Sequence, residues 1–402
     1  MGKSELRHPH HLMTSHSYNI YKEWHQTPNT SLQQNKHNMN CQSHFIVFKP
    51  TAAPSLQSQF DDIAAQMSAW MLAHEVKMEQ ILAVRVCFSD ISNQMEEFRH
   101  HTLARQLEAA CLVSCVEQPL LDGTKVGLQL WATQREDLTK TPVDGGWLVE
   151  TEDEVIVMQT VRFSAQEAQG QNACRQTHMA FDRHIALLAD YGMNLRDHCQ
   201  RTWIYVRDID RHYAGVVKGR NEVFEREGLT SQTHFIASTG IGGYDDNSES
   251  IVCMDFVSVK NKHDQAKVVY LQAPDYLNPT IEYGVAFERG TALNLMGERY
   301  RLISGTASID HHGRCLYHGD VLAQTERLFL NISKLLEADG SSLTEVCVMI
   351  VYLRDIADAA LVQQYMDTHY PDIPSLLVQA RVCRPEWLIE VACIAKSPLS
   401  EQ

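Results

Sequence analysis

The chain has 402 residues, a length that predicts two or three domains. Hydrophobic residues make up 44% of it and charged residues 21%, which is the composition of a globular protein. The net charge of -15 argues against nucleic acid as a partner, because binding to phosphates requires a basic face. A small anionic substrate remains compatible with this charge if arginines line its pocket.

The cysteines favour a reducing compartment. There are eleven of them, none forms a Cys-x-x-Cys pair, and several lie in apolar runs. We therefore expect reduced thiols and a cytoplasmic protein. No stretch approaches the roughly 18 consecutive apolar residues of a membrane helix, so no membrane partner is expected.

Residues 1–43 are polar, rich in His and Asn, and lack the apolar core of a signal peptide. We interpret them as a disordered leader. The alternative is a metal site built from His8, His10 and His11, although this segment shows no ligand spacing.

Three segments, 77–91, 195–209 and 343–356, resemble one another. Each is a largely apolar run that ends in Asp-Ile, a pattern typical of a strand followed by an aspartate that caps the next helix. The three aspartates are Asp90, Asp208 and Asp355. The alternative is chance, because Asp-Ile is a common dipeptide and the first copy is the weakest.

The surroundings of these segments repeat as well. An amphipathic helix is expected before each of them, at 56–73, 174–190 and 321–338. A second helix and two strands follow, the second of these strands at 126–131, 250–257 and 387–395. Each copy is thus an α+β layer with two helices on one face of a sheet. Three copies could bury their free sheet faces against one another, as the subunits of a homotrimer do.

The last third of the chain carries a series of spaced motifs. A strand of small residues at 303–309, Ile-Ser-Gly-Thr-Ala-Ser-Ile, is followed by Gly-Asp at 319–320, Gln-Thr at 324–325 and Asn-Ile at 331–332. An apolar strand with one glutamate, Glu390, closes the series. In this order the motifs resemble the RidA (YjgF) superfamily, whose members have also been labelled endoribonuclease L-PSP and translation initiation inhibitor.

The resemblance implies an α+β fold built from RidA-like units, three in one chain, that form a pseudotrimer. We expect a divergent unit at 44–150, a second unit at 151–270 and a complete C-terminal unit at 285–398. Such a chain would be a monomer or a small homo-oligomer.

Within the superfamily, the chorismatases look most similar. Their Ser-Gly-Thr-Ala-Ser-Ile pattern is present whole at 304–309, and the segment 237–242 resembles their glycine-rich loop. Further similarities are the strand at 201–205, Gly219-Arg220, Phe287-x-Arg289 and Cys383-Arg384. The resemblance implies an enzyme that releases pyruvate from chorismate, together with a hydroxybenzoate or a dihydroxycyclohexadiene carboxylate, without a cofactor. We expect no metal, because His311, His312 and His318 do not have ligand spacing with any carboxylate.

Glu390 is the expected catalytic acid. It is the one charged residue in a strongly apolar strand, and a buried carboxyl holds its proton to higher pH. Cleavage of chorismate requires a proton on the carbon of its enol ether and then an oxygen nucleophile, so a proton donor is needed. The alternative is a carboxylate that pairs with an arginine in a purely structural role.

The two carboxylates of chorismate require guanidinium groups. The candidates are Arg220 and Arg289, which each adjoin a glycine and lie near an aromatic residue, and Arg201, Arg381 and Arg384. For any one of them, a solvated surface charge is the alternative.

Three further residues are expected at the site. Cys383 precedes Glu390 by seven residues and is either a nucleophile or part of the wall; a buried structural cysteine is the alternative. Tyr205 is expected to donate a hydrogen bond to the substrate, unless it packs in an interface. Gly240, in a glycine-rich segment, would let the backbone approach the ligand.

Two other functions stay open. The first is an enamine or imine deaminase of the RidA type. Against it, the arginine that holds the substrate carboxylate in those enzymes is replaced by Leu376. The second is a binding protein that has kept the fold without catalysis.

Overall fold

The computed structural model describes residues 43–51, 54–263 and 268–399. The expected leader therefore lies outside the described residues, apart from Ser43. Ten of the eleven cysteines are described, and these ten are free thiols. Among the described residues, no helix combines the length and the apolar character that crossing a membrane requires.

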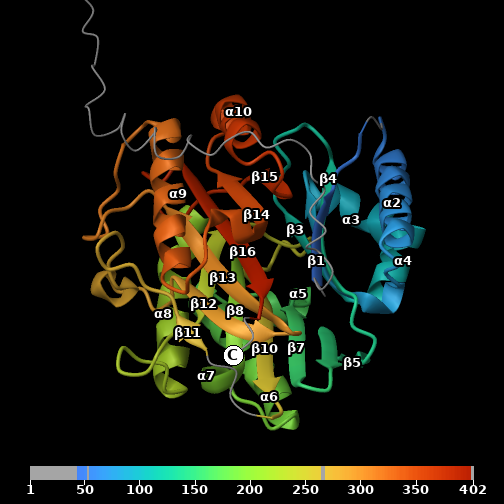
Figure 1. Cartoon of the computed structure of the whole chain (residues 1–402), viewed down its shortest axis with the longest axis horizontal. Helices are drawn as coiled ribbons and strands as arrows, with labels where there is room; N and C mark the ends of the chain where they lie inside the picture. Colours follow the sequence, from blue (N-terminus) through green and yellow to red (C-terminus); the bar gives the residue numbers. More distant parts are fainter. Residues whose placement is uncertain (1–42, 52–53, 264–267, 400–402) are drawn as a thin grey trace, which may run out of the picture. The chain divides into compact units, whose positions relative to one another are not determined.

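The described residues form three β-sheets that share one order of four strands (Figure 1). The first sheet contains β1 (Ser43–Phe48), β4 (Val126–Thr133), β2 (Ile81–Phe88) and β3 (Leu112–Glu117). The second contains β7 (Glu154–Val161), β10 (Val252–Asn261), β8 (Cys199–Val206) and β9 (Ala237–Gly242). The third contains β13 (Glu298–Ala307), β16 (Ile389–Pro398), β14 (Val346–Leu353) and β15 (Ser375–Gln379). The predicted α+β fold with a threefold repeat is confirmed.

Extra strands extend two of the sheets. The hairpin of β5 (Thr139–Val143) and β6 (Gly146–Glu150) pairs with β7, so it belongs to the second sheet. The boundary expected at residue 150 thus falls between two neighbouring strands of one sheet. In the third sheet, β11 (Val269–Tyr270) pairs with β12 (Gly290–Leu295), which pairs with β13.

Helices cover the outer face of each sheet. The first sheet has α2 (Leu56–Ala73), α3 (Ile91–His100) and α4 (Thr102–Glu108), with η1 (Met78–Gln80) before β2. The second has α5 (Ala165–Ala168), α6 (Ala173–Asp190), α7 (Leu195–His198) and α8 (Ile209–Arg226). The third has α9 (Val321–Glu337) and α10 (Ala359–His369), with the short turns η2 (Thr280–Tyr283), η3 (Leu343–Glu345) and η4 (Ile356–Asp358).

The expected aspartate caps form in two of the three copies. Asp90 accepts a hydrogen bond from the backbone of Asn93 at the start of α3, and Asp355 accepts one from Ala357 at η4. The expected cap at Asp208 is wrong: this residue has φ 46° and ψ 60°, and its side chain makes no cap hydrogen bond to α8. A side-chain cap normally requires β-region backbone at this position.

The inner faces of the three sheets share one apolar core. It draws side chains from the strands of every sheet, including Phe45, Met158, Val257, Tyr300 and Leu302. Each sheet also touches the next at its edge. The β9 edge, for example, meets β13 through hydrogen bonds from the Ser238 and Gly305 backbones. The ring closes where the backbone of Leu121 bonds to Leu377. A closed ring of three such contacts is the arrangement of a trimer, here within one chain.

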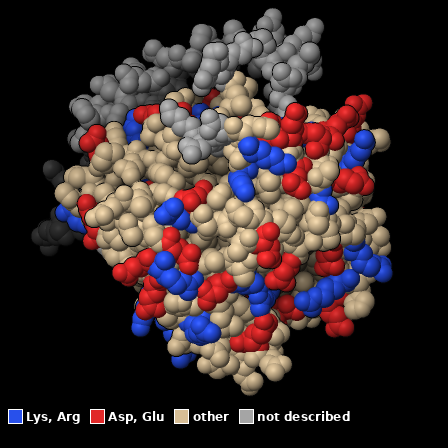
Figure 2. Space-filling model, turned by 90° about the horizontal axis from the view of Figure 1, so that it is seen from below, with Lys and Arg blue, Asp and Glu red and all other residues tan. Residues whose placement is uncertain are grey.

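Charges of both signs mix on the molecular surface. On the face shown in Figure 2, acidic and basic side chains lie among one another, without a broad basic area. This face gives no support to phosphate-backbone binding.

Candidate active site

A pocket lies between the second and third units. One wall comes from α8 and β9 of the second unit. The other comes from β13, β16 and the segments 285–289 and 383–387 of the third. Six of the nine sequence-predicted residues line it: Glu390, Cys383, Arg220, Arg289, Arg384 and Gly240. Interfaces between units are common places for small-molecule sites.

Glu390 provides the buried acid of this pocket. It lies on β16, between Ala307 of β13 and Tyr352 of β14, and its side chain is 4% exposed. Burial raises the pKa of Glu390 to about 8, against the opposing effect of Arg201 and Arg289. A carboxyl with this pKa is largely protonated at pH 7 and can donate its proton.

The backbone beneath Glu390 is shaped to receive the carboxyl group. The pairing of β13 with β16 shifts register between Ile303 and Thr306, a bulge of the kind found beside active sites. Gly305 lies in this bulge, and a Cβ atom there would be 2.0 Å from Glu390 Oε1. Only glycine therefore leaves room for the carboxyl in its present position.

Ser304, beside that glycine, joins the two units at the pocket. Its hydroxyl donates to the carbonyl of Glu288 (2.6 Å) and accepts from the backbone N–H of Ser238 on β9 (2.9 Å). The backbone N–H of Ser304 donates to the carbonyl of Arg289. The Ser-Gly pair of the strand motif thus fixes the register of the bulge against the second unit.

Two guanidinium groups lie near one aromatic ring in the pocket. The Arg289 guanidinium carbon is 5.3 Å from the centre of the Phe287 ring, and that of Arg220 is 5.9 Å from it. Both side chains are buried, at 6% and 2% exposure. Arg289 also donates to the carbonyl of Asn278 (3.1 Å), which holds it at the pocket wall. Two cations held in this way suit a ligand that carries two carboxylates.

Helix α9 holds the pocket walls through the motif residues that the sequence singled out. The side chain of Gln324 donates to the carbonyl of Glu386 (3.0 Å) and accepts from the backbone of Leu388 (2.9 Å). Asn331 donates to the carbonyls of Ala307 and Ile309 (both 3.1 Å). These bonds fix both strand segments next to Glu390.

Cys383 lies beside Glu390 and Tyr213. Burial raises the pKa of the Cys383 thiol to about 12, and the nearby Glu390 adds to this effect. The nucleophilic form of cysteine is the thiolate, which is scarce at neutral pH when the pKa is so high. The raised pKa therefore favours a wall or hydrogen-bonding role for Cys383 over a nucleophilic one.

Trp387 is a pocket residue that the sequence analysis missed. Its side chain is buried, and among the described residues its indole Nε1 has no hydrogen-bond partner. A buried donor without a partner is costly, so a ligand acceptor would stabilise it. Arg384 lies over the Trp387 ring, with its guanidinium carbon 4.9 Å from the ring centre.

Arg201 lies beneath the pocket rather than in its wall. It is 1% exposed, stacks on Trp203, and donates to Thr239 Oγ1 (2.5 Å). That same oxygen accepts from the backbone N–H of Gly305. Burial lowers the pKa of Arg201 to about 10. The positive charge of Arg201 still favours the ionised form of Glu390 and so lowers the pKa of that carboxyl, although Arg201 does not line the pocket.

The structure places Tyr205 and Arg381 outside the pocket. Tyr205 is fully buried, and its hydroxyl donates to Asp255 Oδ2 (3.0 Å) in the interior. Arg381 is exposed and pairs with Asp210 at the surface (3.0 Å). Only its backbone approaches the glycine-rich strand, by accepting a hydrogen bond from Gly242.

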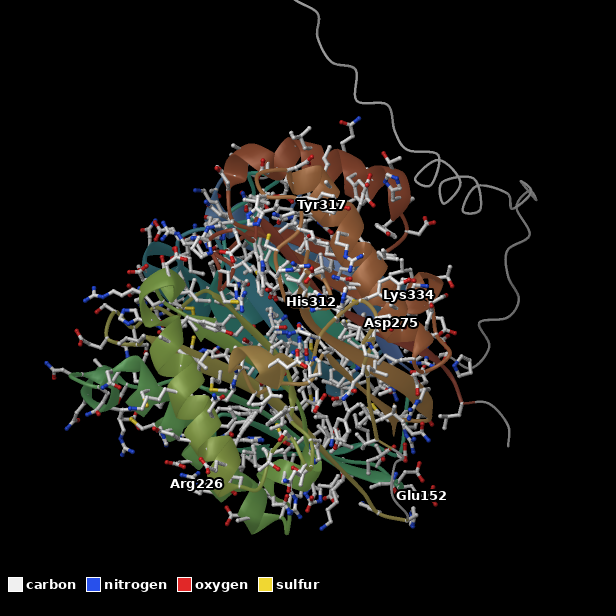
Figure 3. The ribbon with its side chains drawn as sticks, turned by 90° about the vertical axis from the view of Figure 1, so that its left-hand side faces the viewer. Glu152, Arg226, Asp275, His312, Tyr317 and Lys334 are labelled. Carbon is white, nitrogen blue, oxygen red and sulfur yellow. The ribbon has the colours of Figure 1, made fainter. Side chains whose placement is uncertain are left out.

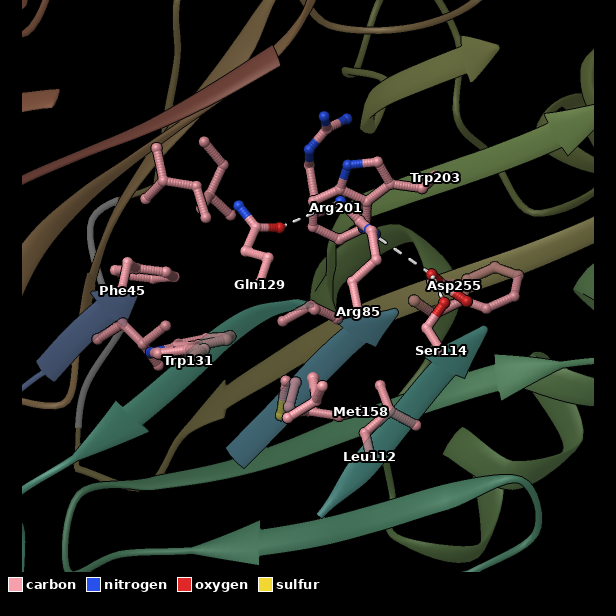
Figure 4. A pocket seen from close by; sticks show the side chains of 17 residues that line it. Phe45, Arg85, Leu112, Ser114, Gln129, Trp131, Met158, Arg201, Trp203 and Asp255 are labelled. Atoms are coloured by element: carbon pink, nitrogen blue, oxygen red, sulfur yellow. Dashed lines mark hydrogen bonds and ion pairs between the residues drawn. The ribbon is translucent and has the colours of Figure 1, made fainter. Parts of the chain in front are cut away.

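Asp255 organises a polar network that joins the first unit to the second, beside a cavity between the three sheets (Figure 4). Its carboxylate accepts from Ser114 (2.6 Å) and Arg162 (3.1 Å), and Arg85 approaches it at 3.8 Å. Burial alone would raise the pKa of Asp255, but the two arginines lower it below its ordinary value. This carboxylate is therefore ionised and structural.

A comparison of the three units explains why one pocket carries the acid. Each unit has an equivalent position in the strand that precedes its Asp-Ile pair, three residues before the aspartate. This position is Cys87 in the first unit, Tyr205 in the second and Tyr352 in the third. Their partners in the adjacent antiparallel strands are Gly127, Cys253 and Glu390. Only the third unit places a carboxyl there.

The interface between the third and first units is filled by apolar side chains. A Cβ atom on Gly127 would meet Leu120 at 2.4 Å and Leu376 at 3.2 Å. Leu376 is fully buried, so this interface offers no guanidinium where the RidA imine deaminases are expected to have one.

The residues that line the pocket do not make a metal site. Among them, only Glu390 and Cys383 are of the types that commonly ligate zinc, and such ions take three or four protein ligands.

Comparisons with known proteins agree with this organisation. Residues 296–397 match the family described as Endoribonuclease L-PSP. The chain is 30% identical over 95 residues to the 3-aminoacrylate deaminase RutC of Acinetobacter baylyi, a match that covers 23% of this chain and 75% of the relative.

A crystal structure of chorismatase shares the fold over most of the chain. It superposes with a TM-score of 0.62 at 18% identity, covering 88% of this chain and 98% of that one. The similarity therefore extends over all three units and not only the C-terminal one.

Proposed function

The chain belongs to the RidA (YjgF) superfamily, and on that premise we propose that the pocket between its second and third units is the active site of a chorismatase-like enzyme. The substrate is chorismate or a closely related dianionic enol ether, and the products are pyruvate and a ring carboxylate. The observation that carries the proposal is a buried Glu390, whose pKa is raised by burial, in one pocket with the guanidinium groups of Arg220 and Arg289.

In the proposed reaction, Glu390 transfers its proton to the methylene carbon of the enol ether. The carbon that bears the ether oxygen becomes electron-poor, and water adds to it while returning a proton to the Glu390 carboxylate. The resulting hemiketal collapses to pyruvate and an alcohol on the ring. The charges of Arg220 and Arg289 neutralise the two substrate carboxylates, and the free Trp387 N–H is available to an acceptor on the substrate.

Cys383 bears on which ring product forms. By resemblance, this position lines the pocket in the chorismatases that make 3-hydroxybenzoate. Since its thiol is protonated at neutral pH, we propose that it shapes the cavity beside the ring and takes no covalent part.

The alternative reaction, deamination of an enamine or imine, draws support from the RutC relative. In this chain the expected carboxylate-binding arginine is replaced by Leu376, which lies in a different interface from Glu390. We therefore favour the first reaction.

The test is a panel of substrates given to the purified full-length chain. Chorismate, iminoacrylate and 3-aminoacrylate are supplied separately, with pyruvate followed by reduction to lactate and ammonia followed in parallel. Pyruvate from chorismate without ammonia from the other two supports the proposal. Ammonia release alone would replace it with the deaminase function, and tight binding of chorismate without turnover would reduce the protein to a binding module.

A further inference from the structure

A second cluster of reactive side chains lies away from the pocket, where α6 and α8 pack together outside the second sheet. Cys174 and His178 are four residues apart on α6, so they share one helix face. Glu222 faces them from α8. Its Oε2 atom is 2.7 Å from His178 Nε2 and 3.7 Å from Cys174 Sγ. One ligand atom of each residue lies within 4.8 Å of the other two.

Two glycines of α8 bring the helices close enough for this contact. A Cβ atom on Gly219 would be 2.6 Å from the carbonyl oxygen of Cys174, and one on Gly215 would be 3.0 Å from Ala173 Cβ. Helix separation depends on the size of the side chains at the contact, so these glycines permit a close approach. Glu222 follows Gly219 by three residues and therefore meets α6 one turn further along.

We propose that Cys174, His178 and Glu222 bind a divalent transition-metal ion, with Zn²⁺ as the best match. Thiolate, imidazole and carboxylate are its common protein ligands. Bond lengths of about 2.0–2.3 Å in a tetrahedral arrangement place such ligand atoms roughly 3.3–3.6 Å apart. The 3.7 Å between Cys174 Sγ and Glu222 Oε2 is close to this range, and the 2.7 Å hydrogen bond between His178 and Glu222 would open by about 0.6 Å when the ion takes its place. Three protein ligands leave the fourth position to water. Binding releases the thiol proton of Cys174 to solvent.

The cluster is open to an ion from solvent. Cys174 and His178 are half-buried, and Glu222 is exposed on α8, the helix that ends at Arg226 in Figure 3. Lys218 is the neighbouring cation, and its Nζ lies 3.9 Å from Glu222 Oε1. Because Lys218 approaches the other carboxylate oxygen, Oε2 is left to serve as the ligand atom. No metal was expected from the sequence. The 44 residues between His178 and Glu222 explain why this cluster gave no signal there.

Bound metal would connect α8 to α6. The same α8 carries Tyr213 and Arg220 on the side that lines the pocket. The ion would therefore stabilise the helix that supplies one wall of the proposed active site, although the metal site does not depend on which reaction occurs there.

The test uses the full-length, reduced protein after treatment with a chelator, titrated with Co²⁺. We expect one equivalent to produce a thiolate-to-cobalt charge-transfer band in the near ultraviolet, which Zn²⁺ then removes. Cys174→Ser should abolish the band, and His178→Gln or Glu222→Gln should weaken the binding at least tenfold. Cys315→Ser, which alters another half-buried thiol, is the matched control and should retain the band.

Absence of the band in the wild-type protein, or its survival in Cys174→Ser, overturns the proposal. Cobalt bound without a thiolate band, for instance by the other histidines, overturns it equally. A second measurement does not depend on the folding of variants: Zn²⁺ should slow the alkylation of Cys174 by iodoacetamide at least tenfold in the wild-type protein, as read by peptide mass. An unchanged rate would contradict the site.

Discussion

Replacing Glu390 by glutamine should make the protein more stable at alkaline pH. Glutamine keeps the shape of the side chain over Gly305 but cannot ionise. In the wild-type protein, the pKa of Glu390 rises from 4.5 to about 8 because the carboxyl is buried. The folded state therefore binds this proton more tightly than the unfolded state does.

The sign and size of the effect follow from this linkage. Between pH 4.5 and about 8 the unfolded chain loses the proton while the folded chain retains it, so wild-type stability falls as the pH rises. At about 1.4 kcal/mol per pH unit, the loss reaches about 3 kcal/mol at pH 7 and levels off near 5 kcal/mol above pH 8. Glu390→Gln lacks this loss, so its advantage over wild type should grow with pH by those amounts.

The assay is urea unfolding of both proteins, followed by circular dichroism at pH 5, 7 and 9. The test is how the difference in unfolding free energy between the two proteins changes with pH. Burying the glutamine amide has a free-energy cost of its own, but this cost does not vary with pH. A difference in unfolding free energy that stays constant across these pH values would refute the assignment of a protonated, buried carboxyl at Glu390. The pH dependence of catalysis should reflect the same carboxyl group. Above pH 8 the protonated form of Glu390 is lost, so pyruvate release by the wild-type protein should fall about tenfold per pH unit.

Four further variants probe the site and its support. Gly305→Ala would place a Cβ atom 2.0 Å from Glu390 Oε1, so pyruvate release should fall at least about a hundredfold while the far-ultraviolet circular dichroism stays unchanged; normal activity would argue against this close contact. Arg220→Lys should raise KM for chorismate about tenfold or more, as the bidentate fork is lost, and an unchanged KM would remove the residue from substrate binding. Cys383→Ala should keep pyruvate release within about tenfold of wild type and alter the ring product seen by chromatography, whereas complete loss would restore the nucleophile hypothesis. Asp255→Asn should cost about 3–5 kcal/mol in urea unfolding, because it leaves buried arginines without their carboxylate, and a smaller cost would mean that water can replace it.

Much of the fold could be predicted because hydrophobic periodicity determines it locally. The helix expected at 56–73 is α2 (Leu56–Ala73), and the one expected at 321–338 is α9 (Val321–Glu337), with the expected apolar face buried. The assignment of the hairpin at 139–150 could not be predicted in this way. The sequence of its strands is compatible with either the first or the second sheet. Only the pairing of β6 with β7 shows that the hairpin belongs to the second.

The candidate site could be predicted in part. Glu390 could be identified because it is a charged residue in an otherwise apolar strand, where charges are rarely buried without a function or a partner. Arg220 could be identified because it follows a glycine within a helix. The direction of the side chains of Arg201 and Tyr205 could not be predicted. Both lie on β8, which is buried on both faces, so the alternation of the strand does not distinguish the pocket from the interior.

Contacts that depend on packing between distant segments could not be predicted. Phe287 was named beside Arg289, but no local pattern indicates that the Arg220 guanidinium approaches its ring from the second unit. The same holds for the Trp387 N–H, which has no hydrogen-bond partner among the described residues. The Cys174, His178 and Glu222 cluster is of the same kind, because it requires two helices to approach through glycines.

Pyruvate release from chorismate by the wild-type protein and by Glu390→Gln, measured side by side at pH 7, tests the central claim most directly. The wild-type protein should release one pyruvate for each chorismate consumed, and the variant should be at least about a hundredfold slower, since a general acid contributes 10² to 10⁴ in rate. No pyruvate from the wild-type protein, or equal rates from the two, would contradict the account.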